Sequence, residues 1–566
     1  MRRTFVMLML VAGMVATAAC SRSAPIRPAP AADASPLPTS SLVQVPIDDA
    51  PAPTDDVPVS TPLPSSPDGR PLITVHVDGD TRPLDDRLFG TNIPAWLGPS
   101  NLGSRDVRTL TTALGASVLR LPGGSWSNAY SWLACETGDS DGCYWTWAAR
   151  PTDFLNFVRA TGQQAMWTVS INGTSKEAAA LVAFFNGSVD DTTVIGVDVR
   201  GKDWKTVGDW AKLRAENGNP EPLPIKLWEV GNEVYGGKPD GGGPECADWG
   251  WEDVWTCDGK EYMLGKGAGA ERHEGYLEFR AAMRAVDPTI MVGAVGVPHP
   301  SDWSNWGNEV IVEGGANLDF YVVHYYAFDR QPESAESILV TPQQIWAGIM
   351  DSTNAAFDAL AGGRRAPVAV TEYNLVAFQE IDNEQIMTRA ANALFVADMV
   401  GQMAVHGVTL ANQWDLANGK AGNGTDYGLI NVDTKERSPQ YYALVLWSRF
   451  ANTLLLVDSP LSDTTTLSLY AGRADDGTLS IMAINKTGEP LDAQLRLDGA
   501  SGTFSVSADT FAAQSLDSTD ITFNGVADPA IDLSDAPAAK VGDVDEALDY
   551  VFAPYSITLL HLVPTP

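Results

Sequence analysis

Two glutamates stand at the ends of short apolar runs, each beside residues that can bind polar ligands. Glu233 ends the run at residues 228–233 (WEVGNE), and Glu372 lies in the run at residues 368–374 (VAVTEYN). A retaining glycosidase needs two such carboxylates, because one attacks the sugar while the other transfers a proton. The pattern therefore predicts an enzyme that cleaves sugars.

The two carboxylates need opposite protonation states at the start of such a reaction. Glu372 would attack the anomeric carbon, and Arg120 and the hydroxyl of Tyr326 would favour its ionised form. Glu233 must give up a proton first and take one later, so we expect its pKa to be raised. Asn232 would donate a hydrogen bond to a sugar hydroxyl. Retention of configuration predicts carboxyl groups about 5 to 5.5 Å apart.

Further polar and aromatic residues follow other apolar runs and are expected around the same site. The remaining candidates for substrate binding are Asn172, His324, Trp414, Trp126 and Trp96, of which the tryptophans would offer apolar faces to sugar rings. Each has a structural alternative: His324 could satisfy a backbone carbonyl, and a glutamate at a barrel rim could form an ordinary salt bridge. Glu229 shares strand parity with Glu233, and we expect it to be a structural partner of Arg120.

Short apolar runs alternate with helical patterns through residues 88–447. The strand candidates are residues 88–93, 118–121, 165–171, 227–231, 291–295, 320–324, 368–371 and 408–414, and helix candidates include residues 271–286 and 383–405. Such alternation indicates the α/β class, and eight units predict a closed (β/α)8 TIM barrel, with a doubly wound open sheet as the alternative. Active sites of such barrels form at the C-terminal strand ends, where both glutamates fall.

The character of the chain changes after residue 447. Residues 448–566 contain short alternating runs between Gly, Asp and Asn turns, which predicts a C-terminal antiparallel β-sandwich. Residues 72–77 alternate in the same way ahead of the barrel. We therefore expect residues 71–87 to supply an N-terminal strand to that sandwich.

The N-terminal residues have the features of a targeting segment. Residues 1–20 combine Arg2 and Arg3, an apolar stretch and small residues before Cys20, which predicts a lipoprotein-type signal peptide with a lipid on Cys20. Plain secretion is the alternative. Residues 21–70 are rich in proline and lack aromatic residues, so they are expected to be a disordered linker. These features predict export to the cell surface or periplasm of a bacterium, with lipid anchoring.

The cysteines and the net charge bear on which bonds, metals and partners we expect for the protein. Besides Cys20, the cysteines form two local pairs, Cys135 with Cys143 and Cys246 with Cys257, which an oxidising compartment would close as disulfides. Metal binding is the alternative, but no histidine lies at ligand spacing. A net charge of −34 argues against nucleic acid partners. We expect a carbohydrate partner, membrane contact only through the lipid, and no cofactor, because two carboxylates suffice.

Five stretches of the chain resemble the clan A glycoside hydrolases, and most of all family 51, the α-L-arabinofuranosidases. They are residues 88–92 (LFGTN), 120–124 (RLPGG), 228–233 (WEVGNE), 323–326 (VHYY) and 371–374 (TEYN). The resemblance implies a catalytic barrel with a β-sandwich that takes one strand from ahead of the barrel. It also implies retaining hydrolysis with Glu233 as acid/base, Glu372 as nucleophile and Asn232 as a substrate contact.

The chain departs from the family pattern at several positions. Residues 93–96 (IPAW) offer no glutamate after the first strand, Ser125 replaces an asparagine, and residues 371–374 read TEYN instead of DEWN. An insertion at residues 236–269, with Trp249, Trp251 and Trp255, is expected to reshape the mouth of the site. Arabinofuranosidase activity is the first hypothesis. The alternatives are a β-glycanase or β-xylosidase of the same clan, or a carbohydrate-binding surface protein without catalysis.

Overall fold

The computed structural model describes residue 66 and residues 69–565, apart from 141, 144, 238–250 and 462–464. The predicted signal peptide with Cys20, most of the predicted linker, Cys246 and Trp249 lie outside these residues. Within the described ranges, no helix has both the length and the apolar character needed to cross a membrane.

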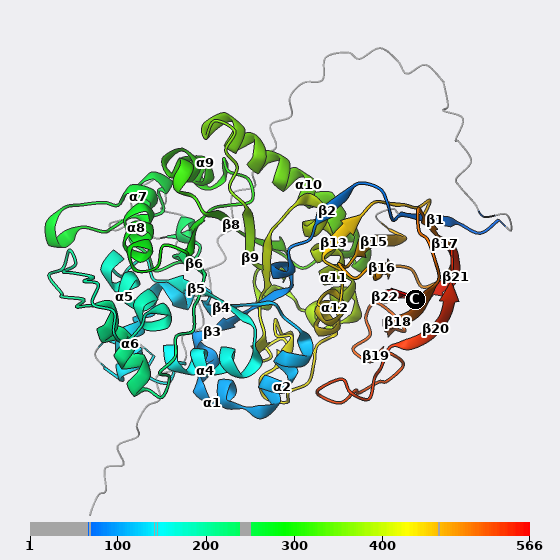
Figure 1. Ribbon diagram of the computed structural model, residues 1–566, viewed down its shortest axis with the longest axis horizontal. Coiled ribbons are helices and arrows are strands. Elements are labelled where there is room, and N and C mark those ends of the chain that lie inside the picture. The colour runs from blue at the N-terminus through cyan, green and yellow to red at the C-terminus, as the bar shows by residue number, and fades with distance from the viewer. Residues whose placement is uncertain are drawn as a thin grey trace, which may run out of the picture. The chain divides into compact units, whose positions relative to one another are not determined.

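A closed barrel of eight parallel strands forms the centre of the larger domain (Figure 1). Its members are β3 (Gly90–Pro94), β4 (Val118–Gly123), β5 (Gln164–Val169), β6 (Leu227–Val230), β7 (Met291–Val295), β8 (Phe320–Phe328), β9 (Val368–Val376) and β10 (Leu410–Gln413). They pair in chain order, and β10 closes the ring on β3. The predicted TIM barrel is therefore confirmed, and the open sheet is excluded.

Helices connect the strands and cover the outside of the barrel. They are α1 (Gly98–Gly103), α2 (Arg105–Leu114), α3 (Trp132–Thr137), α4 (Pro151–Thr161), α5 (Ser175–Asn186), α6 (Val207–Glu216), α7 (Gly259–Leu264), α8 (Tyr276–Val286), α9 (Asp302–Gly314), α10 (Ala335–Leu360), α11 (Ala390–His406) and α12 (Pro439–Trp447). The sequence placed the start of α11 at residue 383, which is wrong. Asp382 accepts hydrogen bonds from the backbone of Ile386 and Met387 and holds the preceding residues in a turn.

The alternation of side chains across the strands separates the barrel interior into layers. An apolar layer fills the interior at the N-terminal side, from Val118, Met166, Leu227, Phe320, Val322, Ala369 and Leu410. Two residues further along their strands, Arg120 and Glu229 point inward in the same way, because strand side chains repeat with a period of two. Trp228 and Val230 pack outward against the helices. The barrel thus places a polar layer directly above an apolar one.

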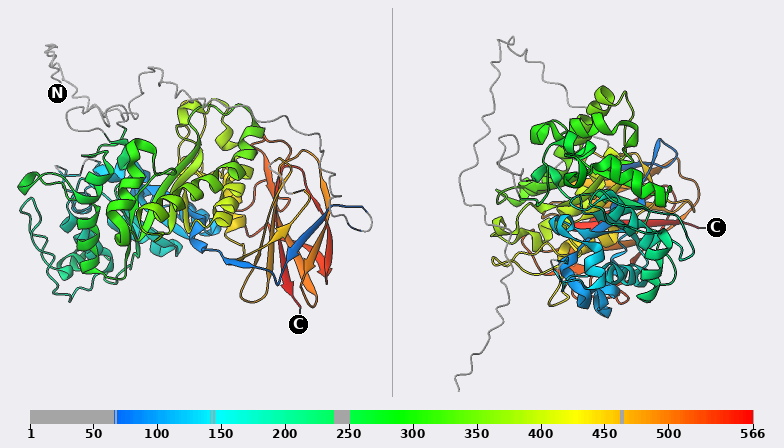
Figure 2. Two further views of the ribbon diagram at one scale, coloured as in Figure 1. Left: turned by 90° about the horizontal axis from the view of Figure 1, so that it is seen from above. Right: turned by 90° about the vertical axis from the view of Figure 1, so that its left-hand side faces the viewer.

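The smaller domain is a β-sandwich (Figure 2, orange and red, with the blue N-terminal strand among them). One sheet has the order β14-β1-β17-β21 and the other β19-β18-β22-β16-β15-β13-β2, with β20 beside β18. Its strands are β1 (Leu72–His76), β2 (Thr81–Pro83), β13 (Thr453–Leu455), β14 (Val457–Asp458), β15 (Leu467–Arg473), β16 (Leu479–Asn485), β17 (Leu491–Asp498), β18 (Phe504–Ala513), β19 (Ile521–Phe523), β20 (Ala539–Val544), β21 (Ala547–Phe552) and β22 (Ser556–Pro564). β1 lies parallel to β17, so the sandwich is not wholly antiparallel as the sequence suggested.

A buried ion pair joins the sandwich to the barrel helices. Lys486 Nζ lies 2.7 Å from Asp398 Oδ2 on α11, and neither side chain is exposed. Tyr470 of β15 packs over Gly401 on the same helix, where a Cβ atom would lie 2.1 Å from its ring. Because a buried charge needs its partner, this pair anchors the two domains together.

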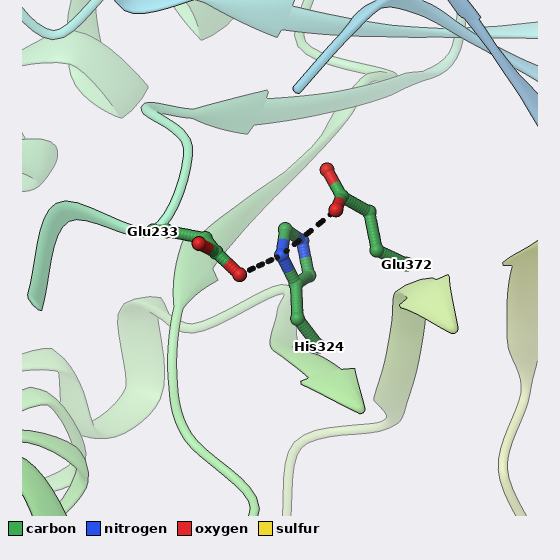
Figure 3. A group of neighbouring side chains, drawn as sticks. All are labelled: Glu233, His324 and Glu372. Carbon is green, nitrogen blue, oxygen red and sulfur yellow. Dashed lines mark hydrogen bonds and ion pairs between the residues drawn. The ribbon is translucent and has the colours of Figure 1, made fainter. Parts of the chain in front are cut away.

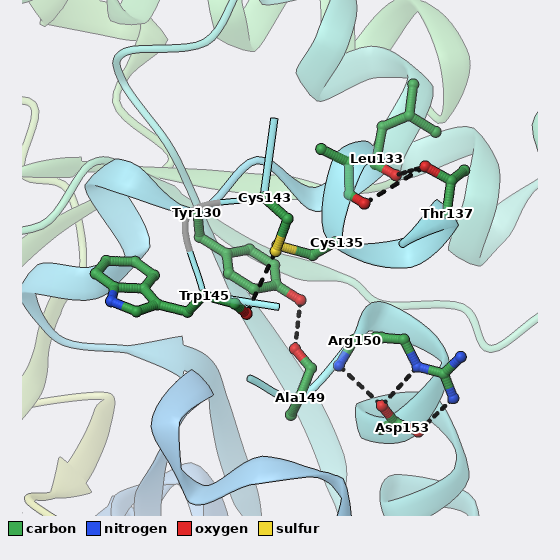
Figure 4. Close-up of a disulfide and its surroundings, with 10 residues drawn as sticks. Tyr130, Leu133, Cys135, Thr137, Cys143, Trp145, Ala149, Arg150 and Asp153 are labelled. Atoms are coloured by element: carbon green, nitrogen blue, oxygen red, sulfur yellow. Dashed lines mark hydrogen bonds and ion pairs between the residues drawn. A yellow bond between two sulfur atoms is a disulfide. The ribbon is translucent and has the colours of Figure 1, made fainter. Parts of the chain in front are cut away.

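A disulfide between Cys135 and Cys143 closes the loop that follows α3 (Figure 4). The Sγ of Cys143 lies 3.4 Å from the carbonyl of Trp145, whose ring stacks on Trp126. Cys257 is also disulfide-bonded. The first of these bridges therefore stabilises a loop that carries aromatic side chains near the barrel mouth.

Candidate active site

Glu233 and Glu372 meet at the C-terminal mouth of the barrel, with His324 between them (Figure 3). One oxygen from each carboxylate and one ring nitrogen of His324 all lie within 4.8 Å of one another. Glu233 lies three residues after the end of β6, at the start of η4 (Val234–Gly236), and has a left-handed backbone, with φ 39° and ψ 40°. Glu372 belongs to β9 and His324 to β8. Three strands thus bring together side chains that are far apart in the sequence.

Glu372 is held by two strong donors and is 5% exposed. Arg120 Nη1 donates to its Oε1 at 2.7 Å, and Tyr326 Oη donates to its Oε2 at 2.8 Å. Each carboxylate oxygen of Glu372 therefore has its own donor, and the two contacts fix the orientation of the side chain.

Arg120 is the centre of a buried polar network. Its Nε donates to Glu229, Nη1 also donates to Asn92 Oδ1 at 2.9 Å, and Nη2 donates to Asn232 Oδ1 at 2.8 Å. Burial opposes its charge, but Glu229 and Glu372 outweigh that effect and raise the pKa of the guanidinium. The expected structural pairing of Glu229 with Arg120 is present. One cation therefore positions both the carboxylate of Glu372 and the amide of Asn232.

Glu233 has a different set of partners. Oε1 accepts hydrogen bonds from His324 Nδ1 at 2.9 Å and Tyr235 Oη at 3.0 Å, and Oε2 accepts one from Trp251 Nε1 at 2.8 Å. Burial alone would raise the pKa of Glu233, but the hydrogen bond and charge of His324, together with Trp251 and Tyr235, hold it below its ordinary value. The raised pKa that the sequence predicted for Glu233 is therefore wrong.

The pKa of His324 is shifted in the opposite direction to that of Glu233. Burial lowers the pKa of the imidazole, but Glu372 and Glu233 outweigh burial and raise it above 6.5. Its Nε2 lies 2.9 Å from Thr371 Oγ1, and its Nδ1 lies 3.6 Å from Glu372 Oε2. The imidazole thus lies between the two carboxylates, and its ring nitrogens contact the side chains of Glu233 and Thr371 rather than a backbone carbonyl.

The pair of His324 and Glu233 makes a pH-dependent contribution to stability. A raised histidine pKa stabilises the fold below 6.5 and loses this effect as pH rises through the folded value. A lowered glutamate pKa stabilises the fold above 4.5 and loses it as pH falls through the folded value. We expect His324→Asn to lower the free energy of unfolding by about 1–3 kcal/mol between pH 4.5 and pH 6.5, and by less at lower or higher pH. Thermal melting of both proteins across this range measures the difference, and a difference independent of pH would contradict the pairing.

Glu252, which the sequence did not single out, completes the network from the insertion after β6. Its Oε1 accepts hydrogen bonds from Asn232 Nδ2 at 3.0 Å and Ser125 Oγ at 2.6 Å, and its Oε2 accepts one from Asn128 Nδ2 at 2.8 Å. The side chain is 1% exposed. Burial and the nearby charge of Glu233 raise the pKa of Glu252 well above its ordinary value, although the three hydrogen bonds act to lower it. Arg120 and Glu252 together fix which way the amide of Asn232 points.

We expect Glu252→Ala to lower kcat/KM on a nitrophenyl glycoside by about tenfold to a hundredfold. Losing one partner of a buried amide costs about 1–3 kcal/mol, and Asn232 would then no longer be held for the substrate. Glu252→Gln keeps the shape and one acceptor, so its loss should be smaller. Equal activity of wild type and Glu252→Ala would show that Asn232 needs no such support.

The other substrate-binding candidates differ in how the structure uses them. Asn172 donates to the backbone carbonyls of Asn128 and Asp253 at 3.1 and 2.6 Å, so its amide serves to hold the loop. Trp414 lies over Gly124, where a Cβ atom would be 2.4 Å from its ring. Trp126 is covered on one face by Trp145, with ring centroids 3.8 Å apart. Trp96 is half-buried in the short helix after β3.

Some residues of this site carried no clear signal in the sequence. Tyr235, Asn128 and Glu252 join it through contacts made by folding, and only the dense aromatic content of the insertion hinted at Trp251.

Glu233, His324 and Glu372 also offer two carboxylates and an imidazole, a donor set that suits a transition metal. An ion there would displace the hydrogen bond of 2.9 Å between His324 and Glu233. This hydrogen bond is also a path along which a proton can pass between His324 and Glu233.

Sequence comparison reveals distant relatives. No protein-family model matches the chain. A stretch of 222 residues is 25% identical to alpha-L-arabinofuranosidase C of Emericella nidulans, covering 37% of this chain and 35% of that protein. The exo-alpha-(1->6)-L-arabinofuranosidase of Bifidobacterium longum is 23% identical over 479 residues, covering 74% of this chain and 83% of that protein. The chain spans about a third to about a half of the length of several curated relatives that it matches.

Solved structures share the fold at low sequence identity. The α-L-arabinofuranosidase of Thermotoga maritima, in its arabinose complex, has a TM-score of 0.63 at 20% identity, covering 87% of this chain and 99% of that one. A family 44 xyloglucanase of Paenibacillus polymyxa has a TM-score of 0.55 at 14% identity, again covering 87% and 99%. By sequence and fold together, the chain is most like the family 51 α-L-arabinofuranosidases among the clan A glycoside hydrolases.

Proposed function

We propose that the protein is a retaining glycoside hydrolase, with α-L-arabinofuranosidase as its activity. One observation carries the proposal: the carboxylates of Glu233 and Glu372 approach within 4.8 Å at the barrel mouth, each with its own set of donors. A separation near 5 Å suits direct attack by one carboxylate, whereas inverting enzymes need about 6.5–9.5 Å to admit a water molecule.

In the first step, an oxygen of Glu372 attacks the anomeric carbon of the sugar. Hydrogen bonds from Arg120 and Tyr326 hold this carboxylate in position for the attack. The bond from the anomeric carbon to the leaving-group oxygen breaks, and that oxygen takes a proton from Glu233. The products of this step are a sugar ester of Glu372 and a free alcohol.

The proton for the leaving group comes along the hydrogen bond between His324 and Glu233. Its transfer from Nδ1 to the carboxylate leaves a neutral imidazole and a neutral acid, which can then protonate the departing oxygen. In the second step, Glu233 takes a proton from water, and the hydroxide attacks the same carbon and releases Glu372. Two displacements at one carbon retain its configuration.

The arabinofuranose assignment is supported by the named activities of the relatives and by the barrel-and-sandwich fold. Release of nitrophenol from the α-L-arabinofuranoside, compared with the β-xyloside and β-glucoside, tests it directly. Proton NMR of the first-formed sugar tests retention. Slower hydrolysis of the arabinofuranoside than of the other glycosides would contradict the arabinofuranose specificity. A first-formed sugar of inverted configuration would contradict the retaining mechanism.

A β-glycanase or β-xylosidase is the second candidate function. One observation favours it: η2 (Ala95–Leu97), which follows β3, offers no carboxylate to the mouth of the barrel. A glucan polymer and xylo-oligosaccharides belong in the same substrate panel. Preferential cleavage of either would favour this candidate over the first.

We further propose that the protein is exported and carries a lipid on Cys20. The sequence pattern of residues 1–20 supports this, although these residues lie outside those that the structure describes. Partition of the full-length protein into a detergent phase, lost in Cys20→Ser, is the expected result. Equal partition of both proteins into the aqueous phase would indicate plain secretion.

A further inference from the structure

We propose that Trp251 and Trp303 form a subsite that binds the sugar ring of the leaving group, so that the enzyme prefers substrates in which arabinose is attached to another sugar. This inference rests on the proposed function, because it assigns Glu233 as the acid. We call these two indole rings the leaving-group platform. Trp251 belongs to the loop after β6 and Trp303 to the segment after β7, so both stand at the barrel mouth.

The two oxygens of Glu233 give the site a direction. Oε1 binds His324, whose Nδ1 also lies 3.6 Å from Glu372, the residue that attacks the sugar. Oε2 binds Trp251 at 2.8 Å on the other side. The departing oxygen must lie beside the acid and away from the nucleophile. The group attached to that oxygen therefore extends toward Trp251.

Trp251 is held in place by its contacts with the loop and is still open to solvent. Its ring lies against Gly236, where a Cβ atom would be only 2.3 Å from it, and its backbone N–H donates to the carbonyl of Gly236 at 3.0 Å. The residue is still 40% exposed despite this contact. A large aromatic ring that is held in place and left open to water beside a catalytic acid suits an apolar sugar face.

Trp303 extends this surface. Its ring centroid lies 5.2 Å from that of Trp251 at an interplanar angle of 73°, and 5.2 Å from that of Tyr235 at 35°. Trp303 itself has a φ of 51°, followed by Ser304 and Asn305 with φ of 56° and 71°. Three successive left-handed residues are costly without glycine, and they lie where the indole of Trp303 packs beside Trp251. The platform is therefore an angled pair of rings suited to a ring-shaped ligand.

The test compares two acceptors that compete for the sugar ester of Glu372. Nitrophenyl α-L-arabinofuranoside loads the enzyme, and methyl β-xylopyranoside and methanol are both supplied. Both acceptors lose their proton to the same base, Glu233, so a change in that base cancels in the ratio of transfer to sugar over transfer to methanol. The ratio therefore measures how well the platform binds a sugar ring. We expect Trp251→Ala to lower this ratio about tenfold, as loss of roughly one buried ring face predicts.

Further variants separate the ring from its N–H group. Trp251→Phe removes the hydrogen bond to Glu233 but keeps an aromatic face, so both transfers should slow while their ratio stays within about twofold of wild type. Leu264→Ala, at a residue on α7 that is 39% exposed, is the matched control and should leave the ratio unchanged. A ratio unchanged in Trp251→Ala, or lowered equally in Trp251→Phe, would overturn the subsite. No release of nitrophenol by wild type would overturn the proposed function as well.

Discussion

Replacement of Glu372 by alanine is expected to lower kcat/KM on nitrophenyl α-L-arabinofuranoside by roughly 10⁴- to 10⁶-fold, as is typical when a nucleophile is removed. The side chain is 5% exposed and is held by hydrogen bonds from Arg120 and Tyr326, so the alanine variant loses the aligned nucleophile. Initial rates with and without added azide measure the effect. Azide is a small anion that fits the space left by the carboxylate and can attack the anomeric carbon itself.

The stereochemistry of the azide product distinguishes the two glutamates. In Glu372→Ala, azide acts in a single displacement and gives a glycosyl azide of inverted configuration. In Glu233→Ala, azide attacks the ester already formed on Glu372, so the product has retained configuration. Glu372→Gln is the conservative control and should show no rescue, because the amide fills the space. Rescue with the same configuration in both alanine variants would contradict the assigned roles.

Replacement of Arg120 by leucine is expected to reduce both stability and activity. Glu229 and Glu372 would lose the cation that neutralises them in a fully buried layer, at a cost of about 3–5 kcal/mol. Asn232 would lose the donor to its Oδ1, and Glu372 would lose its alignment. We expect kcat/KM to fall at least about 10³-fold, as two such contacts to the reacting groups predict. Denaturant unfolding and initial rates measure the two effects.

Arg214 provides a matched control for this prediction. It is also fully buried, but its guanidinium donates to backbone carbonyls, including those of Phe184, Gly187 and Asn219. Arg214→Leu should therefore destabilise the fold while the folded fraction keeps its kcat/KM. The double variant Arg120→Leu/Glu229→Leu should regain part of the stability and none of the activity. Full activity in folded Arg120→Leu would show that the network has no role in catalysis.

Strand alternation and the two glutamate motifs were readable from local sequence. All eight barrel strands correspond to runs of apolar residues in the sequence. Barrel strands are buried on both faces, so their residues are apolar except where they contribute side chains to the polar layer. The inward direction of Glu229 followed from parity with the neighbouring positions in β6. The two glycines of residues 120–124 (RLPGG) were also part of the sequence pattern. The structure shows why glycine is needed at position 124: the ring of Trp414 leaves no room for a Cβ atom.

The sequence by itself determined the class of fold, the strand that delivers each glutamate and the side of the barrel on which they meet, because these depend on periodicity and chain order. Tertiary structure decided the parallel pairing of β1 with β17, the partners of Glu233 and the place of Trp251 and Glu252 in the site. Those features depend on contacts between distant segments. The balance between burial and the charge of His324, which sets the pKa of Glu233, exists only after folding brings the two groups together.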